Sequence, residues 1–141
     1  MNFFEAVETC LTKYATFRGR APRSEYWWFF LFNLIVSAVA RLIPLLGIII
    51  PLAMLLPNMA VSVRRLHDTD RSSWFLLLPA PAVVILIVLA VIAINGQVAA
   101  AGLLARIFGL IALGCWAVLW VWFCQRGTLG PNRYGADPLA P

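Results

Sequence analysis

Charged residues are scarce in this sequence, and acidic residues are the scarcest. Of the 141 residues, 12% are charged and 62% are hydrophobic, and Asp and Glu together number six. A globular domain in water has about 25% charged and about 45–50% apolar residues. The composition therefore excludes an ordinary water-soluble domain. It indicates a chain solvated by lipid, with length for a single membrane domain, residues 1–141.

Residues that bind metals or exchange electrons are also few. The chain has one histidine, and its three cysteines, Cys10, Cys115 and Cys124, show neither a C-x-x-C pattern nor zinc-ligand spacing. His67 has two aspartates nearby, but three arginines share that run, which makes it a poor set of metal ligands. We therefore expect no metal, no redox centre and no cofactor.

Long uncharged stretches replace the missing polar residues. A helix needs about 20 apolar residues to cross a bilayer. Residues 26–63 carry one charge, Arg41, and are nearly twice that length, so Pro44 and Gly47 are expected to divide them into two helices. Two more apolar stretches follow. We predict membrane-spanning helices at residues 26–43, 47–63, 74–94 and 105–124, followed by a cytoplasmic tail at 125–141.

The N-terminal segment has a different pattern. Over residues 2–17 apolar side chains recur every three or four positions, which predicts an amphipathic helix, and Asn2 with Glu5 has the spacing of a capping box. Such a helix either lies in the headgroup layer or packs on the membrane helices, and the pattern favours neither. The predicted fold class is all-α: a four-helix membrane bundle with this amphipathic helix at its N-terminus.

The basic residues predict the orientation. Nine of the eleven fall on one side of these helices, and only Arg41 and Arg106 fall on the other. Because basic loops stay in the cytoplasm during insertion, both termini are expected to be cytoplasmic. The same rule accounts for the net charge of +5, and we expect no nucleic-acid partner.

Three polar segments interrupt the apolar chain, and this topology puts all three at the cytoplasmic face. We name them together the polar cap. They are Phe17–Trp28, Arg64–Trp74 and Gly127–Pro138.

Short runs in these segments carry a resemblance to a known family. They are Gly19-Arg20-Ala21, Arg23 to Trp27, Arg65-Leu66-His67-Asp68, Arg71-Ser72, Asn132 to Gly135 and Asp137-Pro138. In this order, between four apolar stretches, they resemble the domain of unknown function 805 family of small bacterial inner-membrane proteins. Ser73 departs from the pattern, since members often have Gly there. The resemblance implies a multi-pass protein of the inner membrane and no established activity.

The arginines of the polar cap have two interpretations. Guanidinium groups bind phosphate oxygens, so the cap is expected to bind anionic phospholipid headgroups or a protein partner. However, all six acidic residues are on the same side, and internal ion pairs would also hold the segments together. The candidate binding residues are Arg20, Arg23, Arg65, His67, Asp68, Arg71, Asn132, Arg133 and Tyr134.

Three classes of function fit a protein of this kind. A non-enzymatic binding or assembly module, as a homo-oligomer or with a membrane-protein partner, is favoured because nothing identifies a catalytic set. A transporter or channel would need polar groups within the helices. The polar residues of the first two predicted helices are uncharged: Asn33, Ser37, Asn58 and Ser62. An enzyme acting on lipid would have to use His67 and Asp68 as acid and base, with no nucleophile in view.

Overall fold

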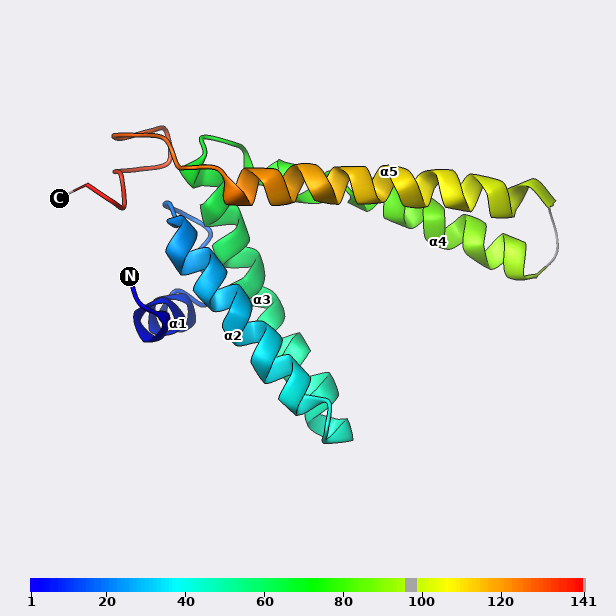
Figure 1. The fold of residues 1–141 in the computed structure, drawn as a ribbon, viewed down its shortest axis with the longest axis horizontal. Coiled ribbons are helices and arrows are strands. Elements are labelled where there is room, and N and C mark those ends of the chain that lie inside the picture. The colour runs from blue at the N-terminus through cyan, green and yellow to red at the C-terminus, as the bar shows by residue number, and fades with distance from the viewer. Residues whose placement is uncertain (96–98, 141) are drawn as a thin grey trace. The chain divides into compact units, whose positions relative to one another are not determined.

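The computed structural model describes residues 1–95 and 99–140. Within this range the chain is helical, with no strand beyond one isolated bridge between Asn132 and Gly135. The predicted all-α class is confirmed. The elements are α1 (Phe3–Thr12), α2 (Arg23–Ala40), α3 (Pro44–Asp68), the 3₁₀ helix η1 (Ser73–Leu77), α4 (Ala80–Ile94) and α5 (Ala99–Cys124) (Figure 1).

Three segments among the described residues are long and apolar enough to cross a membrane: Pro44–Asp68, Ser73–Ile94 and Ala100–Cys124. The chain is therefore a transmembrane protein. α2 is not among these three, because its 18 residues start with the polar run Arg23-Ser24-Glu25. The predicted bundle of four spans is thus supported for three of them.

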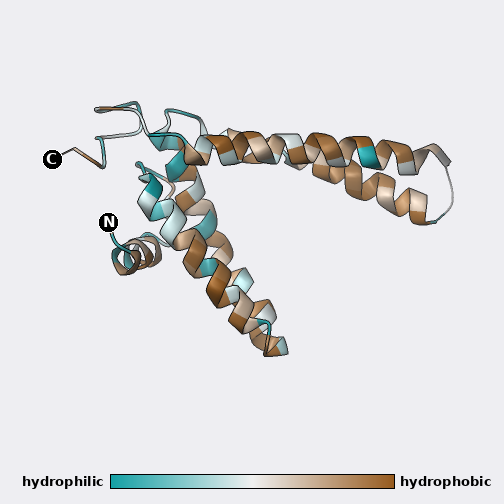
Figure 2. Ribbon diagram, in the orientation of Figure 1, coloured by the Kyte–Doolittle hydropathy of each residue, from teal (hydrophilic) through white to brown (hydrophobic). Residues whose placement is uncertain are grey.

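The chain divides into two compact units. The first consists of Met1–Ser73 together with Phe123–Pro141, and the second is Trp74–Trp122. The first unit holds α1, α2, α3 and the tail, while the second holds α4 and most of α5. Hydrophobic residues run along nearly the whole length of α4 and α5 (Figure 2).

In the first unit α2 and α3 form an antiparallel hairpin. The turn between them lies at residues 41–43, and α3 begins at Pro44 instead of the predicted residue 47. A proline in the first helical turn is tolerated because the N–H that it lacks would have no partner inside the helix. Gly47 permits the close turn, since a Cβ there would lie 3.3 Å from the Cα of Arg41.

Two prolines lie inside α3, and one of them has a compensating contact. Pro57 has no N–H to donate to the carbonyl of Ala53, four residues earlier. The hydroxyl of Tyr14, in the loop after α1, donates to this carbonyl instead. The side chain of Asn58 donates to the carbonyl of Met54 at 2.8 Å. The chain after α1 is therefore tied to α3 where the proline interrupts its hydrogen bonding.

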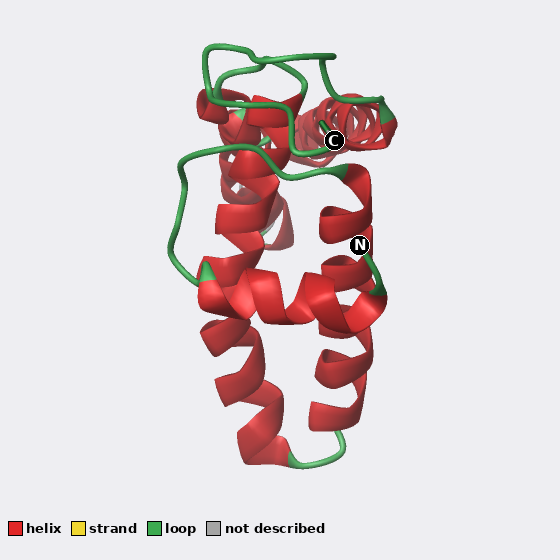
Figure 3. Cartoon of the chain, turned by 90° about the vertical axis from the view of Figure 1, so that its left-hand side faces the viewer, coloured by secondary structure: helices red, strands yellow, loops and turns green. Residues whose placement is uncertain are grey.

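α1 lies across α2 and α3 (Figure 3). The predicted capping box is present, with the amide of Glu5 donating to Asn2 at 2.9 Å. The helix is shorter than the predicted 2–17 and ends at Thr12. It buries Ala6 and Cys10 against its neighbours, so it packs on these helices. Its other face exposes Phe4, and contact of that face with headgroups stays a prediction.

In the second unit the predicted helix at 74–94 is divided. Residues Ser73–Leu77 form η1, and α4 starts only at Ala80. The reason is that Pro79 and Pro81 lack N–H groups and fit only at the start of an α-helix. α5 starts at Ala99, before the predicted residue 105, and residues 96–98 of the predicted connection lie outside the described residues.

Candidate functional site

The polar cap residues of the first unit meet around the end of α3, where two backbone hydrogen bonds join the segments. The amide of Ala21 donates to the carbonyl of Arg64 at 3.0 Å, and the amide of Thr128 donates to the carbonyl of Asp68 at 2.8 Å. α3 continues five residues beyond the predicted end at Val63 and includes the first charged residues of its cap segment. The loop before α2 and the tail thus both attach to the last turn of α3.

Asp68 is the centre of this arrangement. Its Oδ1 accepts from Nε of Arg20 at 3.0 Å, and its Oδ2 accepts from Nη1 of Arg65. All three side chains are at least 95% buried. The tail crosses directly over the carboxylate at Gly127, where a Cβ would lie 2.2 Å from Oδ2 of Asp68. Only a glycine fits at that point without displacing the ion pairs.

The two arginines also hold the backbone of the tail. Arg20 donates from Nη1 to the carbonyl of Gly130 at 2.6 Å, and from Nη2 to that of Thr128. Arg65 donates from Nε to the carbonyl of Phe123 at 3.1 Å, and from Nη2 to that of Gln125. The last carbonyls of a helix have no intrahelical donor and carry partial negative charge, so a cation there is stabilising. Every nitrogen of these two guanidinium groups has an internal acceptor.

His67 lies between the loop before α2 and the tail. Its ring stacks on Tyr134 with centroids 3.8 Å apart and planes 4° apart. Its Nδ1 lies 3.2 Å from the carbonyl of Gly19, which can only accept, so Nδ1 carries the hydrogen in this contact. The side chain of Asn132 donates to the carbonyl of His67 at 2.9 Å. The structure thus brings together three of the predicted site residues, His67, Asn132 and Tyr134. Their contacts join the tail to the end of α3.

The C-terminus of α3 closes with a Schellman motif. Asp70 has a φ of +56°, the amide of Arg71 donates to the carbonyl of Leu66 at 2.9 Å, and that of Asp70 donates to His67 at 3.0 Å. Arg133 pairs with Asp70 at 3.1 Å, and both side chains are about half exposed. Arg71, half-buried, donates to the carbonyl of Thr69 at 3.4 Å.

A separate buried ion pair joins α2 and α3 beside α1. The expectation of internal ion pairs included Glu25 with an arginine, but Arg64 is not among the predicted site residues. Arg64 pairs with Glu25, and the thiol of Cys10 lies 3.7 Å from the same carboxylate. Burial, together with the charge of Glu25, raises the pKa of the Cys10 thiol to about 12. Nε of Arg64 is buried and has no partner among the described residues. The available signal was a Glu and an Arg at adjoining ends of antiparallel helices.

A cavity of about 400 Å³ opens beside the cap. Arg23 and Arg126 line it, together with Asp68, whose carboxylate is already paired. α2 starts at this cavity, and its N-cap, Pro22, makes no side-chain hydrogen bond to the helix. Arg23 donates to the carbonyl of Cys124 at 3.3 Å and is otherwise exposed. The cavity therefore combines two accessible cations with the positive end of a helix.

No group of three or more His, Cys, Asp or Glu side chains among the described residues is placed to hold a metal ion. Helices able to cross a membrane, with an arginine-rich cluster at one end of α3, define a transmembrane protein with a polar cap. The chain belongs to the family described as "Protein of unknown function (DUF805)", whose model matches residues 14–45 and 40–136. The expected family is confirmed.

Two Escherichia coli K12 proteins are similar over most of their length. Inner membrane protein YhaI is 39% identical over 137 residues, which cover 91% of this chain and 90% of that protein. Inner membrane protein YhaH is 35% identical over 140 residues, which cover 91% of each. No solved structure matches the chain. These names give an inner-membrane location for the relatives and no activity.

Proposed function

We propose that this protein is a non-enzymatic, multi-pass protein of the inner membrane that binds anionic phospholipid headgroups at the cytoplasmic surface. The observation that carries the proposal is the cavity lined by Arg23 and Arg126 at the start of α2. Anions bind favourably at helix N-termini, where N–H groups are unpaired, and guanidinium groups add charge-assisted hydrogen bonds to phosphate oxygens. The inner leaflet supplies such phosphates.

Internal contacts distinguish two arginines that build the polar cap from two that line the cavity. Arg20 and Arg65 donate to Asp68 and to backbone carbonyls, so their role is to build the cap. Arg23 and Arg126 are exposed at the cavity and have donors to spare. The two interpretations of the sequence, internal pairing and headgroup binding, are therefore compatible because different residues serve each.

A topology of four spans, with both termini in the cytoplasm, belongs to this proposal. α3 is apolar enough to cross the bilayer, and α2 runs antiparallel to it from the turn at residues 41–43 (Figure 3). α2 therefore has to return through the same layer. Its polar first turn then lies in the headgroup region, and Arg41, exposed at the turn, reaches the opposite surface.

The arrangement of His67 supports a role without catalysis. A general base needs a free nitrogen within reach of a substrate proton. His67 is stacked on Tyr134, and its Nδ1 contacts the carbonyl of Gly19. Tyr134 contacts His67 through its ring face, and the carbonyl of Gly19 can only accept a hydrogen bond, so neither contact supplies a second catalytic group.

The test compares two double variants with the same change in net charge. Arg23→Glu with Arg126→Glu alters the cavity, and Lys13→Glu with Arg18→Glu alters exposed basic residues that do not line it. Native mass spectrometry in mild detergent counts bound phosphatidylglycerol and phosphatidylcholine. We expect the cavity variant to bind one phosphatidylglycerol molecule about tenfold or more weakly, since each charged hydrogen bond contributes about 1.5–3 kcal/mol. Equal loss in both variants would contradict the proposal.

A further inference from the structure

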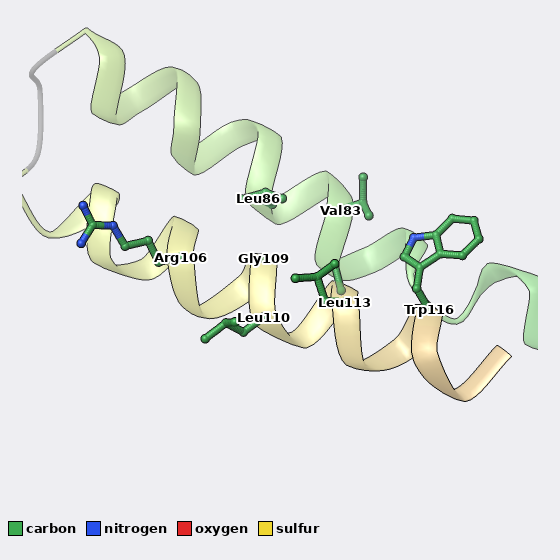
Figure 4. Close-up of a pocket in the computed structure, with 8 residues that line it drawn as sticks. Val83, Leu86, Arg106, Gly109, Leu110, Leu113 and Trp116 are labelled. Carbon is green, nitrogen blue, oxygen red and sulfur yellow. The ribbon is translucent and has the colours of Figure 1, made fainter. Parts of the chain in front are cut away.

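The second unit contains an apolar groove between α4 and α5 that has one cation at its end (Figure 4). The cavity has a volume of about 570 Å³. Val83 and Leu86 line it from α4, and Arg106, Gly109, Leu113 and Trp116 line it from α5. None of the polar cap residues takes part.

Gly109 shapes the groove by its lack of a side chain. A Cβ there would lie 3.8 Å from Cδ1 of Leu86, which is ordinary van der Waals contact, so α4 and α5 approach closely at this level. Further along α5, the side chains of Leu113 and Trp116 are exposed. The result is a depression with apolar walls that opens to the surroundings.

Arg106 is the only charged residue of the second unit, and the unit has no Asp or Glu with which it could pair. The ion pairs of the described residues all belong to the first unit. In Figure 4 the guanidinium of Arg106 extends away from Trp116, toward the end of the groove nearest the start of α5. A charge within a membrane helix is costly unless it reaches water or an anion.

The length of the groove matches one leaflet of a bilayer. Arg106 and Trp116 are ten residues apart, which on an α-helix is about 15 Å along the axis. The hydrocarbon core of a bilayer is about 30 Å thick, so one leaflet is about 15 Å deep. A phosphate at Arg106 would therefore lie at the membrane surface while an acyl chain followed the groove to the bilayer centre.

We propose that this groove is a binding site for one anionic phospholipid, with its phosphate on Arg106 and an acyl chain along Gly109 and Leu113. The apolar walls recognise the acyl chain, and the uncompensated positive charge selects an anionic headgroup. A neutral lipid would contact the apolar walls but would give Arg106 no net negative charge. A second copy of the chain would bring no acidic residue from its own second unit.

The test uses the full-length chain in mild detergent and native mass spectrometry, with phosphatidylglycerol and phosphatidylcholine of identical acyl chains. Arg106→Gln is expected to weaken the binding of one phosphatidylglycerol molecule about tenfold and to abolish the preference of the groove for phosphatidylglycerol over phosphatidylcholine. Arg41→Gln is the control, because Arg41 is an exposed arginine in the first unit. Inorganic phosphate is expected not to compete, because it has no acyl chain.

A second pair of variants tests the walls. Gly109→Leu fills the groove and is expected to lower the binding of both lipids, whereas Gly114→Leu leaves it open, because a Cβ at Gly114 meets nothing within 4 Å. Unchanged lipid binding in Arg106→Gln or in Gly109→Leu overturns the proposal. A dimer that Gly109→Leu dissociates would assign the groove to a second copy and would also overturn it.

The groove of the second unit and the proposed cytoplasmic site can be tested separately. Arg23→Glu with Arg126→Glu is expected to leave the Arg106-dependent lipid bound, and Arg106→Gln is expected to leave the lipid bound by the cavity of the first unit. Counting the lipids that remain on each variant distinguishes the two.

Discussion

Replacing Asp68 by Asn should release the tail from the end of α3 and from the loop before α2. The substitution keeps the shape of the side chain but removes the negative charge that Arg20 and Arg65 share. Removing one partner of a buried ion pair costs about 3–5 kcal/mol, because the other charge is left buried and uncompensated. Here two cations lose the same partner, and their side chains are at most 2% exposed, so solvent screens them little.

The magnitude can be read from hydrogen exchange of the tail. The amide of Thr128 donates to the backbone carbonyl of Asp68, a bond that the variant keeps. If the tail opens about 3 kcal/mol more easily, the open population and the exchange rate of this amide rise by about a hundredfold. Exchange followed by mass spectrometry on the peptide that contains Thr128 measures this rate.

Asp70→Asn provides the matched control. It makes the same chemical change two residues away, at an exposed pair with Arg133. Exposed ion pairs contribute about 0–1 kcal/mol, so exchange at Thr128 should rise by less than about fivefold. If Asp68→Asn exchanged no faster than Asp70→Asn, the carboxylate of Asp68 would not be what holds the tail, and the reasoning would be refuted.

Three further changes test other contacts. Gly127→Ala should also open the tail, because the added Cβ would overlap the carboxylate of Asp68. Hydrogen exchange at Thr128 should become faster, and unchanged exchange would contradict the close approach of the tail to Asp68. Burial raises the pKa of the Cys10 thiol to about 12, so Cys10 should resist maleimide at pH 8 while the exposed Cys124 reacts. Mass spectrometry measures the labelling of each cysteine, and equal labelling would show that Cys10 is accessible. The N–H groups of Leu139 and Gly130 hold the pKa of Asp137 below its ordinary value, so this contact stabilises the tail above about pH 4 and is lost as the pH falls through the lowered pKa. Exchange at the Gly130 amide should therefore increase in acid, beyond the intrinsic dependence on pH, and Asp137→Asn should remove that increase.

The meeting of the three polar segments could be predicted from the sequence, whereas their pairing could not. Charge-free stretches predict the helices, and the helices bring the segments to one side. Arg64 and Arg65 show the limit. Neighbours on a helix point about 100° apart, so Arg64 meets Glu25 while Arg65 meets Asp68 and the end of α5. Which arginine faces which partner depends on the rotation of α3 about its axis, and packing with the other helices fixes that rotation.

Two of the helix boundaries that differ from the prediction show physical reasons for the difference. The apolar pattern stops at Val63, yet α3 continues to Asp68, because ion pairs compensate the charges of its last turn. The late start of α4, by contrast, could have been predicted from the sequence. Pro79 and Pro81 mark the beginning of a helix more strongly than the apolar residues before them.

The contacts of Arg20 and Arg65 also constrain the order in which the polar cap can form during synthesis. Both residues are translated well before their carbonyl acceptors at Thr128, Gly130 and Gln125, which lie 60 to 110 positions later in the sequence. Until those three residues have been made, Arg20 can pair with Asp68, and Arg65 with Asp68 and the carbonyl of Ala21, while water occupies their other donors. The cap therefore closes only after α5 has been synthesised, and a chain truncated before Gln125 keeps hydrated arginine donors that the longer chain buries.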